Sequence, residues 1–466
     1  MRRARTVAAT ALTLFAALLP TPGQAATPPH GPTGWATAGS GTTGGAGAAA
    51  DSVWTVTTRA ELKTALGNHG DPTAPKIIRI RGDISGHEAD DGTIRTAENY
   101  APGFDLGAYM SCFGESGTTW SDTRFDYCKQ QRILRQTGSN AEKLQIQLTV
   151  PSNTTVLGVG DDARLLGVDL TVNAGTNIVV RNLTLEAPVD YFTTWSPDDG
   201  AEGNWNARFD AMSVVTGVNL WVDHCTFTDG RHLDSKAPTG FHGKPVQRHD
   251  GLLDIEDAAD YITVSDSQFR DHDKTLLIGS GDSRGDRDRG HLRITFARNL
   301  FANTAERSPR VRFGQVHTYN NYFTASTTDR ESPVLSEKLG GAGYFLGLGL
   351  ESAIVSENNA YSYTGPGASP DVIVADFKGN RFSDRGSWFN GRPVDTESVA
   401  RTKYETTRAA AVTEAESTGT PVPDWATQDF TTDPGWSPSA AYAYHPLRSA
   451  AAVKSYVLRH SGAGRV

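Results

Sequence analysis

The chain has 466 residues, enough for two ordinary domains or for one extended repeat fold. Its 53 Asp and Glu residues outnumber its 44 Lys and Arg residues, and the formal net charge at pH 7 is −9. This acidity argues against nucleic acid as a partner, and against an acidic substrate unless cations are gathered in one place.

The N-terminus has the three parts of a secretory signal peptide. A basic start (Arg2, Arg3, Arg5) precedes an apolar run (residues 7–19), and small residues follow at a cleavage point. The apolar run of about 13 residues is too short to span a bilayer core of roughly 30 Å. We therefore expect residues 1–25 to be removed and the protein to be secreted and extracellular, without a membrane anchor.

The next predicted elements are short. Residues 26–50 are rich in Gly, Ala and Thr, and we expect them to be flexible. Thr58 and Glu61 form a capping box, which predicts a short helix that Gly67 ends. Residues 76–81 then have the pattern of a strand.

The cysteines divide into a possible pair and a single residue. Residues 85–142 are polar and predicted to be loops, and they contain Cys112 and Cys128, which could pair in an oxidising compartment. Cys225 lies in a strand-like run, so we expect a buried thiol. No cysteine spacing resembles a zinc site.

From about residue 144 onward, short apolar strands recur, and six of them align as one repeat. Seven residues after a β-branched or Leu anchor, each unit has Leu or an aromatic residue. The anchors are Ile178, Leu220, Ile262, Ile294, Val316 and Ile354. The last three units also have an asparagine five residues after the anchor, at positions 299, 321 and 359.

Such a repeat is typical of stacked coils, because like rings stack and asparagine amides can hydrogen-bond between layers. The smallest anchor spacing, 22 residues, suits one coil of a parallel β-helix, and Val156 lies 22 residues before Ile178 as an expected earlier anchor. The alternative is an all-β sandwich, whose strands alternate without repeating in register.

We therefore predict an all-β fold, a single-stranded parallel β-helix. Helical stretches around residues 397–415 and 449–460 are expected to cover one side or end of the coils. The domain would span residues 51–466, with a C-terminal covering segment from about 365 to 466. We expect a monomer.

Charged residues gather at one part of this repeat. Measured from the nearest anchor, five of them fall between positions 10 and 14 of a coil: Asp210, Asp250, Asp254, Lys274 and Arg307. Because layers stack about 4.8 Å apart, we expect the five on one lateral face. Arg312, at position 18, lies outside this set but has a long side chain.

The three aspartates have the chemistry of a calcium site. They offer hard oxygen ligands, which Ca²⁺ takes at about 2.3–2.6 Å. Residues i and i+4 of a straight strand lie about 13 Å apart, so the chain must bend between Asp250 and Asp254, where Gly251 allows it. The plainer alternative is that each aspartate caps a turn.

The cations have the chemistry of a carboxylate site. Arg310 and Arg312 would face the same side of a strand, and forked cations suit planar carboxylates. The alternative is salt bridges with Asp and Glu, an interpretation that fits Arg310 better than Arg307 or Arg312. Calcium beside several cations implies an acidic ligand such as a uronate polymer.

Lys274 also has a plainer interpretation. It lies in the run Asp271-His272-Asp273-Lys274 and could simply pair with Asp271 or Asp273.

Over about residues 150–325, the motifs WVDHCTF, DGLLDI, YITVS, DHDKTLLIG and RSPRVRFGQVH resemble those of secreted pectate lyases of polysaccharide lyase family one. Ser308 stands where the family usually has Ala, and Glu256-Asp257 where a basic or small residue is common. The resemblance implies a right-handed parallel β-helix and Ca²⁺-dependent β-elimination of de-esterified polygalacturonate, a component of pectin, to unsaturated oligogalacturonides.

The resemblance also implies roles for the charged residues. Asp210, Asp250 and Asp254 look like the calcium ligands, and Lys274 and Arg312 look like binders of the substrate carboxylate. A sixth residue, Arg307, looks like the general base.

An arginine base needs an explanation, because arginine is normally always protonated. Calcium, Lys274 and Arg312 would have to disfavour charge on Arg307, and the rate should then rise into the alkaline range. The sequence suggests no general acid, and water is our interpretation.

Three other functions fit parts of the pattern. The first is a pectin lyase that acts on the esterified polymer, which would not need a calcium bridge. The second is a hydrolase such as a polygalacturonase, which needs a tight pair of carboxylic acids. The third is a non-catalytic polysaccharide-binding β-helix protein.

Overall fold

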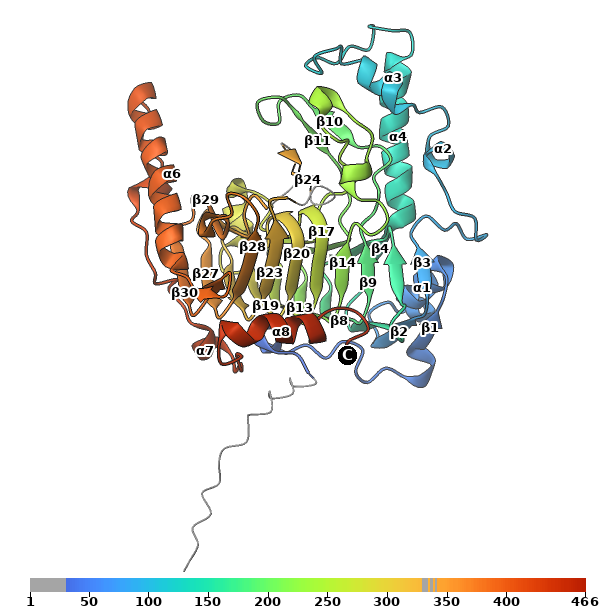
Figure 1. Ribbon diagram of the computed structural model, residues 1–466. Helices are drawn as coiled ribbons and strands as arrows, with labels where there is room; N and C mark the ends of the chain where they lie inside the picture. Colours follow the sequence, from blue (N-terminus) through green and yellow to red (C-terminus); the bar gives the residue numbers. More distant parts are fainter. Residues whose placement is uncertain (1–30, 329–333, 336–337, 340–341) are drawn as a thin grey trace, which may run out of the picture. The chain divides into compact units, whose positions relative to one another are not determined.

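Parallel strands in three sheets follow one another coil after coil along the chain (Figure 1). The computed structural model describes residues 31–328, 334–335, 338–339 and 342–466, so the predicted signal peptide lies outside the described residues. Residues Gly31–Val466 form one unit.

The first sheet contains the anchors. In sheet order its strands are β1 (Val53–Val56), β2 (Lys76–Ile80), β5 (Thr154–Gly158), β8 (Thr176–Arg181), β13 (Val218–Asp223), β16 (Asp260–Ser265), β19 (Arg293–Ala297), β22 (Gln315–Tyr319), β27 (Ala353–Glu357) and β30 (Arg381–Arg385).

The second sheet follows it in each coil. Its strands are β3 (Asp83–Ser85), β6 (Arg164–Leu166), β9 (Thr184–Glu186), β14 (Thr226–Thr228), β17 (Gln268–Lys274), β20 (Leu300–Glu306), β23 (Tyr322–Ser326), β28 (Ala360–Thr364), β31 (Trp388–Phe389) and β32 (Arg392–Pro393). Only its last pair, β31 and β32, is antiparallel among the described strands of this sheet.

The third sheet completes the coil. Its strands are β4 (Gln147–Thr149), β7 (Asp169–Asn173), β12 (Met212–Val215), β15 (Leu253–Glu256), β18 (Leu277–Ile278), β21 (Arg310–Val311), β26 (Leu346–Gly349) and β29 (Val374–Phe377). Two antiparallel hairpins lie outside the coils: β10 (Thr194–Ser196) with β11 (Asn204–Asn206), and β24 (Val334–Leu335) with β25 (Lys338–Leu339).

The strand register confirms the predicted repeat. All six anchors lie opposite one another in neighbouring strands of the first sheet, from Ile178 to Ile354. The predicted earlier anchor is wrong: Thr154, not Val156, lies opposite Ile178, because that coil is two residues longer than the shortest spacing implied.

Like residues stack inside the coils as the repeat predicted. Phe227, Phe269, Phe301, Phe323 and Tyr361 form a continuous column with ring centroids 4.7–5.1 Å apart. All five are buried, and each such pair adds about 0.5–1.5 kcal/mol to the burial of its surface. The column therefore ties successive coils together.

An asparagine ladder runs through three of the same coils. The backbone and side-chain amides of Asn299 donate to Oδ1 of Asn321 at 2.8 and 3.0 Å. Those of Asn321 donate to Oδ1 of Asn359 at 2.8 and 3.1 Å. These are the predicted positions, and they satisfy backbone amides that the turns leave unpaired.

Helices lie around the coils: α1 (Arg59–Gly67), α2 (Ala97–Tyr100), α3 (Leu106–Ser111), α4 (Cys128–Ile146), α5 (Gly285–Asp288), α6 (Thr396–Thr418), α7 (Pro438–Ala441) and α8 (Ala450–His460). Thr58 caps α1 as predicted, but the helix runs through Gly67 and Asn68 ends it in the left-handed conformation. None of the helices among the described residues has the length and apolar character that a membrane crossing requires.

Both predicted C-terminal helices are present and packed on the coils. α8 contacts the second sheet through the buried side chains of Val453, Tyr456 and Val457. α6 lies beside β29 and β30 and buries Ala400 and Tyr404 in the main core.

The expectation of loops over residues 85–142 is wrong for α4. This 19-residue helix buries a face that is mostly polar or small, including Gln131, Gly138, Ser139 and Glu142. At Gly138 the helix touches the ring of Phe192, where a Cβ would stand 2.4 Å away. Because the buried face has few apolar side chains, the sequence shows no clear hydrophobic period.

The expectation of a flexible segment also fails over its described part, residues 31–50. The backbone amides of Trp35 and Ala36 donate to Thr295 Oγ1 and Thr263 Oγ1 at 3.1 and 3.0 Å. Trp35 is buried, so the segment packs along the first sheet.

A second hydrophobic cluster lies outside the coils, and we call it the aromatic lobe. It consists of buried Tyr109, Phe113, Trp195, Trp205, Phe241 and Val246. A disulfide joins Cys112 to Cys128 in the same part of the chain, and Cys225 is a buried free cysteine in the coils.

Candidate active site

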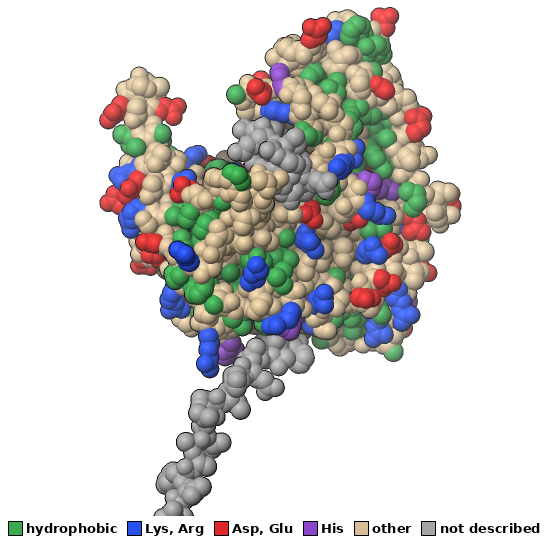
Figure 2. Space-filling view, in the orientation of Figure 1, with side chains coloured by type: hydrophobic (Ala, Val, Ile, Leu, Met, Phe, Trp, Pro, Cys, Tyr) green, Lys and Arg blue, Asp and Glu red, His purple; other side chains and the backbone are tan. Residues whose placement is uncertain are grey.

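Acidic and basic side chains are interspersed over the face of the molecule shown in Figure 2. On this face a cation-rich site for an acidic ligand would therefore be a local cluster of side chains and not one large patch.

Asp210 and Asp254 lie on adjacent coils of the third sheet. Asp210 precedes β12, and Asp254 is in the neighbouring strand β15, opposite Ser213. Asp210 accepts hydrogen bonds from Gly251 N and Ser213 Oγ, both at 2.7 Å. Asp254 Oδ1 accepts one from Leu277 N at 2.9 Å. Backbone and hydroxyl donors therefore fix both carboxylates.

The predicted bend between Asp250 and Asp254 is present at Leu252. The amides of Leu252 and Leu253 both donate to Thr275 O, at 3.1 and 3.2 Å, so the chain turns on one acceptor. A Cβ on residue 251 would stand 2.6 Å from Asp254 Oδ1 and 2.9 Å from Asp210 Oδ1. The glycine thus lets the two carboxylates approach each other.

The crowded aspartates have unusual acidities. Burial raises the pKa of Asp254 to about 7, with a further contribution from the charge of Asp250. Burial also raises the pKa of Asp210 well above its usual range, followed by the charges of Asp254 and Asp250. A hard divalent cation would relieve this repulsion, so the donor set fits Ca²⁺.

Lys274 ends β17 beside these aspartates. Its Nζ lies 3.0 Å from Gln247 Oε1 and 3.6 Å from Asp250 Oδ1. The ion pair of Lys274 is thus with a predicted calcium ligand, not with the neighbouring Asp271 or Asp273 as the plainer interpretation proposed.

Arg307 directly follows β20, and its neighbour Glu306 lies opposite Lys274 in the register. Its Nε donates to Glu306 Oε1 at 3.1 Å, and its backbone φ is +60°. Its carbonyl accepts from Leu276 N at 2.7 Å, which fixes the turn between the second and third sheets. Lys274 and Arg307 therefore lie in adjacent coils, on the lateral face that their positions in the repeat predicted.

The charge of Arg307 differs from the expectation. Burial lowers its pKa, but Glu306, Tyr344, Asp254 and Asp250 outweigh burial and raise the pKa above its usual range. The surrounding side chains therefore hold the guanidinium charged. A base at this position would need its charge opposed by a cation or by groups that come with the substrate.

Arg312 pairs with a carboxylate outside the predicted calcium ligands. Its Nε donates to Asp282 Oδ1 at 2.8 Å and its Nη1 to Gly279 O at 2.9 Å. Lys378 Nζ lies 2.6 Å from the second oxygen of Asp282, so this carboxylate bridges two cations.

Arg310 has a different role from the salt bridge that we expected. Its guanidinium lies 3.8 Å from the centroid of the Phe377 ring, and its buried Nε has no hydrogen-bond partner among the described residues. Burial lowers its pKa, and the charges of Arg312 and Arg307 lower it further. Arg307 and Arg312 form ion pairs with carboxylates, whereas the sequence favoured a salt bridge for Arg310.

Sequence reasoning missed two residues that touch this group, Gln247 and His272. His272 lies 2.5 Å from Asp229 Oδ1 through Nδ1 and 2.8 Å from the carbonyl of Asp250 through Nε2. Both are buried. His272 lies two residues before Lys274, and this spacing could have indicated it, whereas no motif in the sequence singles out Gln247.

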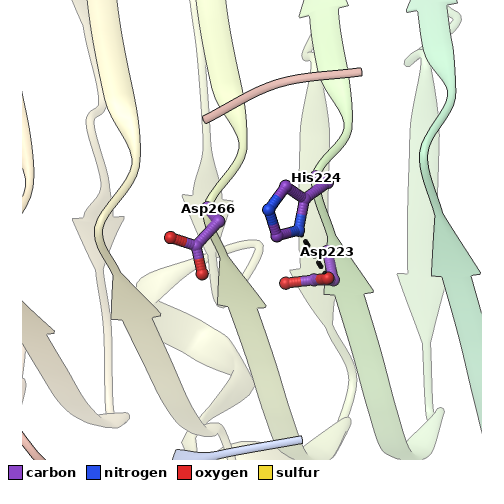
Figure 3. A group of neighbouring side chains, drawn as sticks. All are labelled: Asp223, His224 and Asp266. Atoms are coloured by element: carbon purple, nitrogen blue, oxygen red, sulfur yellow. Dashed lines mark hydrogen bonds and ion pairs between the residues drawn. The ribbon is translucent and has the colours of Figure 1, made fainter. Parts of the chain in front are cut away.

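A second group of acidic residues has its ligand atoms close enough together to hold a metal ion. Among the described residues, only Asp223, His224 and Asp266 offer ligand atoms that all lie within 4.8 Å of one another (Figure 3). Arg181 pairs with Asp223 at 2.8 Å, and Arg298 with Asp266 at 2.6 Å. These carboxylates are already neutralised, so we regard the crowded aspartates as the better cation site, although Asp210, Asp250 and Asp254 would have to move closer together.

Comparisons with known proteins agree with this chemistry. The sequence model of a family described as pectate lyase matches residues 135–466. The chain is 33% identical over 434 residues to a pectate lyase of Bacillus subtilis (strain 168), across 93% of this chain and 92% of that protein. It is 36% identical over 383 residues to pectate lyase D of Dickeya chrysanthemi, across 80% and 82%. The solved structure of a pectate lyase bound to a hexasaccharide is 32% identical, covers 93% of this chain and 97% of that one, and has a TM-score of 0.79.

Proposed function

This chain belongs to the pectate lyase family and is a polysaccharide lyase, and from that premise we propose that it is a secreted enzyme that cleaves de-esterified polygalacturonate by Ca²⁺-dependent β-elimination. The products would be unsaturated oligogalacturonides. The same proposal includes a right-handed coil, because parallel crossovers are right-handed in about 98% of cases. It also includes a covering role for α6 and α8.

The observation that carries the proposal is the crowding of carboxylates around Gly251, directly beside two cations. Asp210 and Asp254 approach each other there, Asp250 faces Lys274, and Arg307 adjoins them. Uncompensated acids next to Lys and Arg suit an acidic polymer that is held through a cation.

The residues divide the work of an elimination. Asp210, Asp250 and Asp254 would hold Ca²⁺, which when bound polarises the uronate carboxylate and acidifies the proton on the adjacent carbon. Lys274 and Arg312 would bind substrate carboxylates, once their present partners Asp250 and Asp282 are displaced or shared.

Arg307 would take the proton from the carbon α to the carboxylate. The C–H electron pair then forms the new C=C bond as the β carbon–oxygen bond breaks, and the leaving oxygen takes a proton from water. This requires a neutral guanidine, so we expect turnover to rise into the alkaline range.

Secretion is supported by two features of the chain. Residues 1–25 have the composition of a signal peptide, and the Cys112–Cys128 disulfide suits an oxidising compartment. A monomer remains our expectation.

A pectin lyase that acts on esterified polymer is the nearest alternative. The three half-buried aspartates lie close together, and the pKa values of Asp210 and Asp254 are raised. A site for a neutral polymer would have no use for such a group of acids. A hydrolase and a non-catalytic binding protein fit the family less well.

An ultraviolet assay on purified enzyme tests the proposal. De-esterified polygalacturonate with Ca²⁺ should give a conjugated product that absorbs in the ultraviolet, EDTA should abolish it, and highly esterified pectin should react poorly. Arg307→Ala should lower turnover by at least 10³-fold while the melting temperature stays near that of the parent, because the general base is lost.

Three outcomes would each contradict part of the proposal. Calcium-independent turnover in the parent would remove the calcium site. Substantial activity in Arg307→Ala, or a rate maximum near pH 5, would remove the arginine base. Faster turnover of esterified pectin would favour the pectin lyase.

A further inference from the structure

We infer that Gln247 is a positioning residue that keeps the Lys274 ammonium from closing fully on its ion-pair partner Asp250, so that Lys274 can still bind the substrate and Asp250 the cation. The inference rests on the proposed function. Lys274 Nζ lies between two acceptors, 3.0 Å from the neutral amide oxygen of Gln247 and 3.6 Å from the charged carboxylate of Asp250. Coulomb attraction alone would favour the shorter distance to the carboxylate, so the amide opposes it.

The orientation of the Gln247 amide follows from its partners. The same atom that faces Lys274 Nζ also accepts from the backbone amide of Ala207, at 3.3 Å. Both partners only donate, so the atom between them must be the oxygen. Ala207 lies three residues before Asp210, and Gln247 lies three before Asp250, so this amide connects both segments that carry the aspartates.

The aromatic lobe holds Gln247 in place. Gln247 is 7% exposed and follows Val246, a buried member of the lobe. A cavity of about 20 Å³ adjoins it, lined by Trp205, Asp234 and Asp273 among others, which is room for about one water molecule. The side chain therefore has little freedom to leave Lys274.

The neutrality of Gln247 matters as much as its position. If the ammonium of Lys274 formed a close ion pair with Asp250, the charge of this calcium ligand would be compensated. The ammonium would then attract the substrate carboxylate less strongly. A carboxylate at position 247 would hold Lys274 more strongly, but it would neutralise the lysine as well. A buried amide holds the ammonium and leaves both charges available.

The test compares Gln247→Met, which keeps the length but lacks the acceptor, with the parent and with Gln145→Met. Gln145 is a matched control, because it is also 7% exposed and donates to the backbone carbonyls of Gly86 and Glu88 in another part of the chain. Calcium affinity is measured by isothermal titration calorimetry without substrate, and kcat and KM on polygalacturonate at saturating Ca²⁺.

Gln247→Met should weaken calcium binding about tenfold and raise KM, because a hydrogen bond to a charged group is lost and Lys274 turns to Asp250. Gln145→Met should change neither quantity, whatever its effect on the melting temperature. In a Lys274→Met background, Gln247→Met should no longer change calcium affinity. Gln247→Glu should raise KM while calcium binds as well as in the parent or better.

An equal loss of calcium affinity with and without Lys274 would overturn the inference, and so would an unchanged affinity in Gln247→Met. If Gln247→Met fails to fold, Gln247→Glu, which fills the same space, decides the question: a raised KM with parental calcium affinity supports the inference, and an unchanged KM overturns it. A parent that binds Ca²⁺ but does not cleave polygalacturonate would refute the proposed function and leave the calcium measurements interpretable.

Discussion

At the scale of single residues, spacing in the sequence predicted where the charged side chains lie but not their pKa values. Asp210, Asp250, Asp254, Lys274 and Arg307 lie close together, as their positions in the repeat predicted. Their charges could not be predicted in the same way, because the pKa of each depends on partners that come from other coils. Glu306 adjoins Arg307 in the chain, but the sequence did not indicate that its carboxylate pairs with this guanidinium or that Tyr344 lies nearby.

The acid sensitivity of folding is also decided by single residues. Burial, with a smaller contribution from nearby His232, lowers the pKa of His87 to about 4. The unfolded chain therefore binds this proton more tightly than the folded chain does. The stability is complete above the unfolded pKa of about 6.5 and is lost as the pH falls towards 4, by about 3 kcal/mol.

Urea unfolding from pH 7 to pH 4 can isolate this histidine. The free energy of unfolding of the parent should fall by about 3 kcal/mol relative to that of His87→Gln, which cannot titrate. The exposed His445 offers a control, and His445→Gln should keep the pH dependence of the parent. Parallel curves for the parent and His87→Gln would contradict the assignment.

At the scale of elements, the repeat predicted the strand register of the first sheet from Ile178 to Ile354, but not the earlier register at Val156. Anchors and stacking rings recur because each must face its equivalent in the next coil. Equivalent positions therefore have similar residues. The helix α4 was not predicted, because its buried face is mostly polar or small, with Gln131, Gly138 and Glu142 among its residues.

The asparagine ladder gives the prediction that belongs to this scale. Asn321 is fully buried and bonds to both neighbouring asparagines, and it also donates to Phe296 O at 3.0 Å. Asn321→Ala would leave several buried polar groups unpaired and should cost about 3 kcal/mol or more in the free energy of unfolding.

Chemical denaturation measures this loss against Asn140→Ala. Asn140 is exposed and accepts from Arg208 Nη1 at 3.0 Å, so its removal should change stability by less than about 0.5 kcal/mol. A similar small change in Asn321→Ala would show that the ladder does not hold the coils together.

At the scale of the whole molecule, segments from both ends of the described chain meet on the first sheet. The ring of Trp35 lies 5.6 Å from that of Trp436 and 5.3 Å from that of Tyr442, and Tyr442 Oη also bonds to His317 Nδ1 at 2.8 Å. The N-terminal segment and α7 lie along the lower edge of the coils in Figure 1, away from the ends of β17 and β20. This contact serves stability, not the site.

Trp35→Ala should therefore separate the two properties. Loss of the buried ring should cost about 3–5 kcal/mol in the free energy of unfolding. The kcat on polygalacturonate should stay within about twofold of the parent value at a temperature where both proteins are folded, since Trp35 touches no site residue.

Calorimetry and the ultraviolet assay check this outcome together. Leu144→Ala is the control, because Leu144 is 83% exposed and its loss should leave both stability and turnover unchanged. A Trp35→Ala protein with normal stability, or with a large loss of kcat at full folding, would refute the separation.

The residue types along the chain were enough to predict the coil register from Ile178 onward, the stacked rings, the asparagine ladder and which charged residues share one face. Each of these depends on like residues at equivalent positions, which a single chain displays directly. Tertiary structure alone decided which charges pair. Gln247 reaches Lys274 from a segment packed on the aromatic lobe, and Asp282 reaches Arg312 from a loop between coils. Such contacts depend on how the inserted segments fold back onto the coils. The repeat of the sequence does not predict the path of these segments.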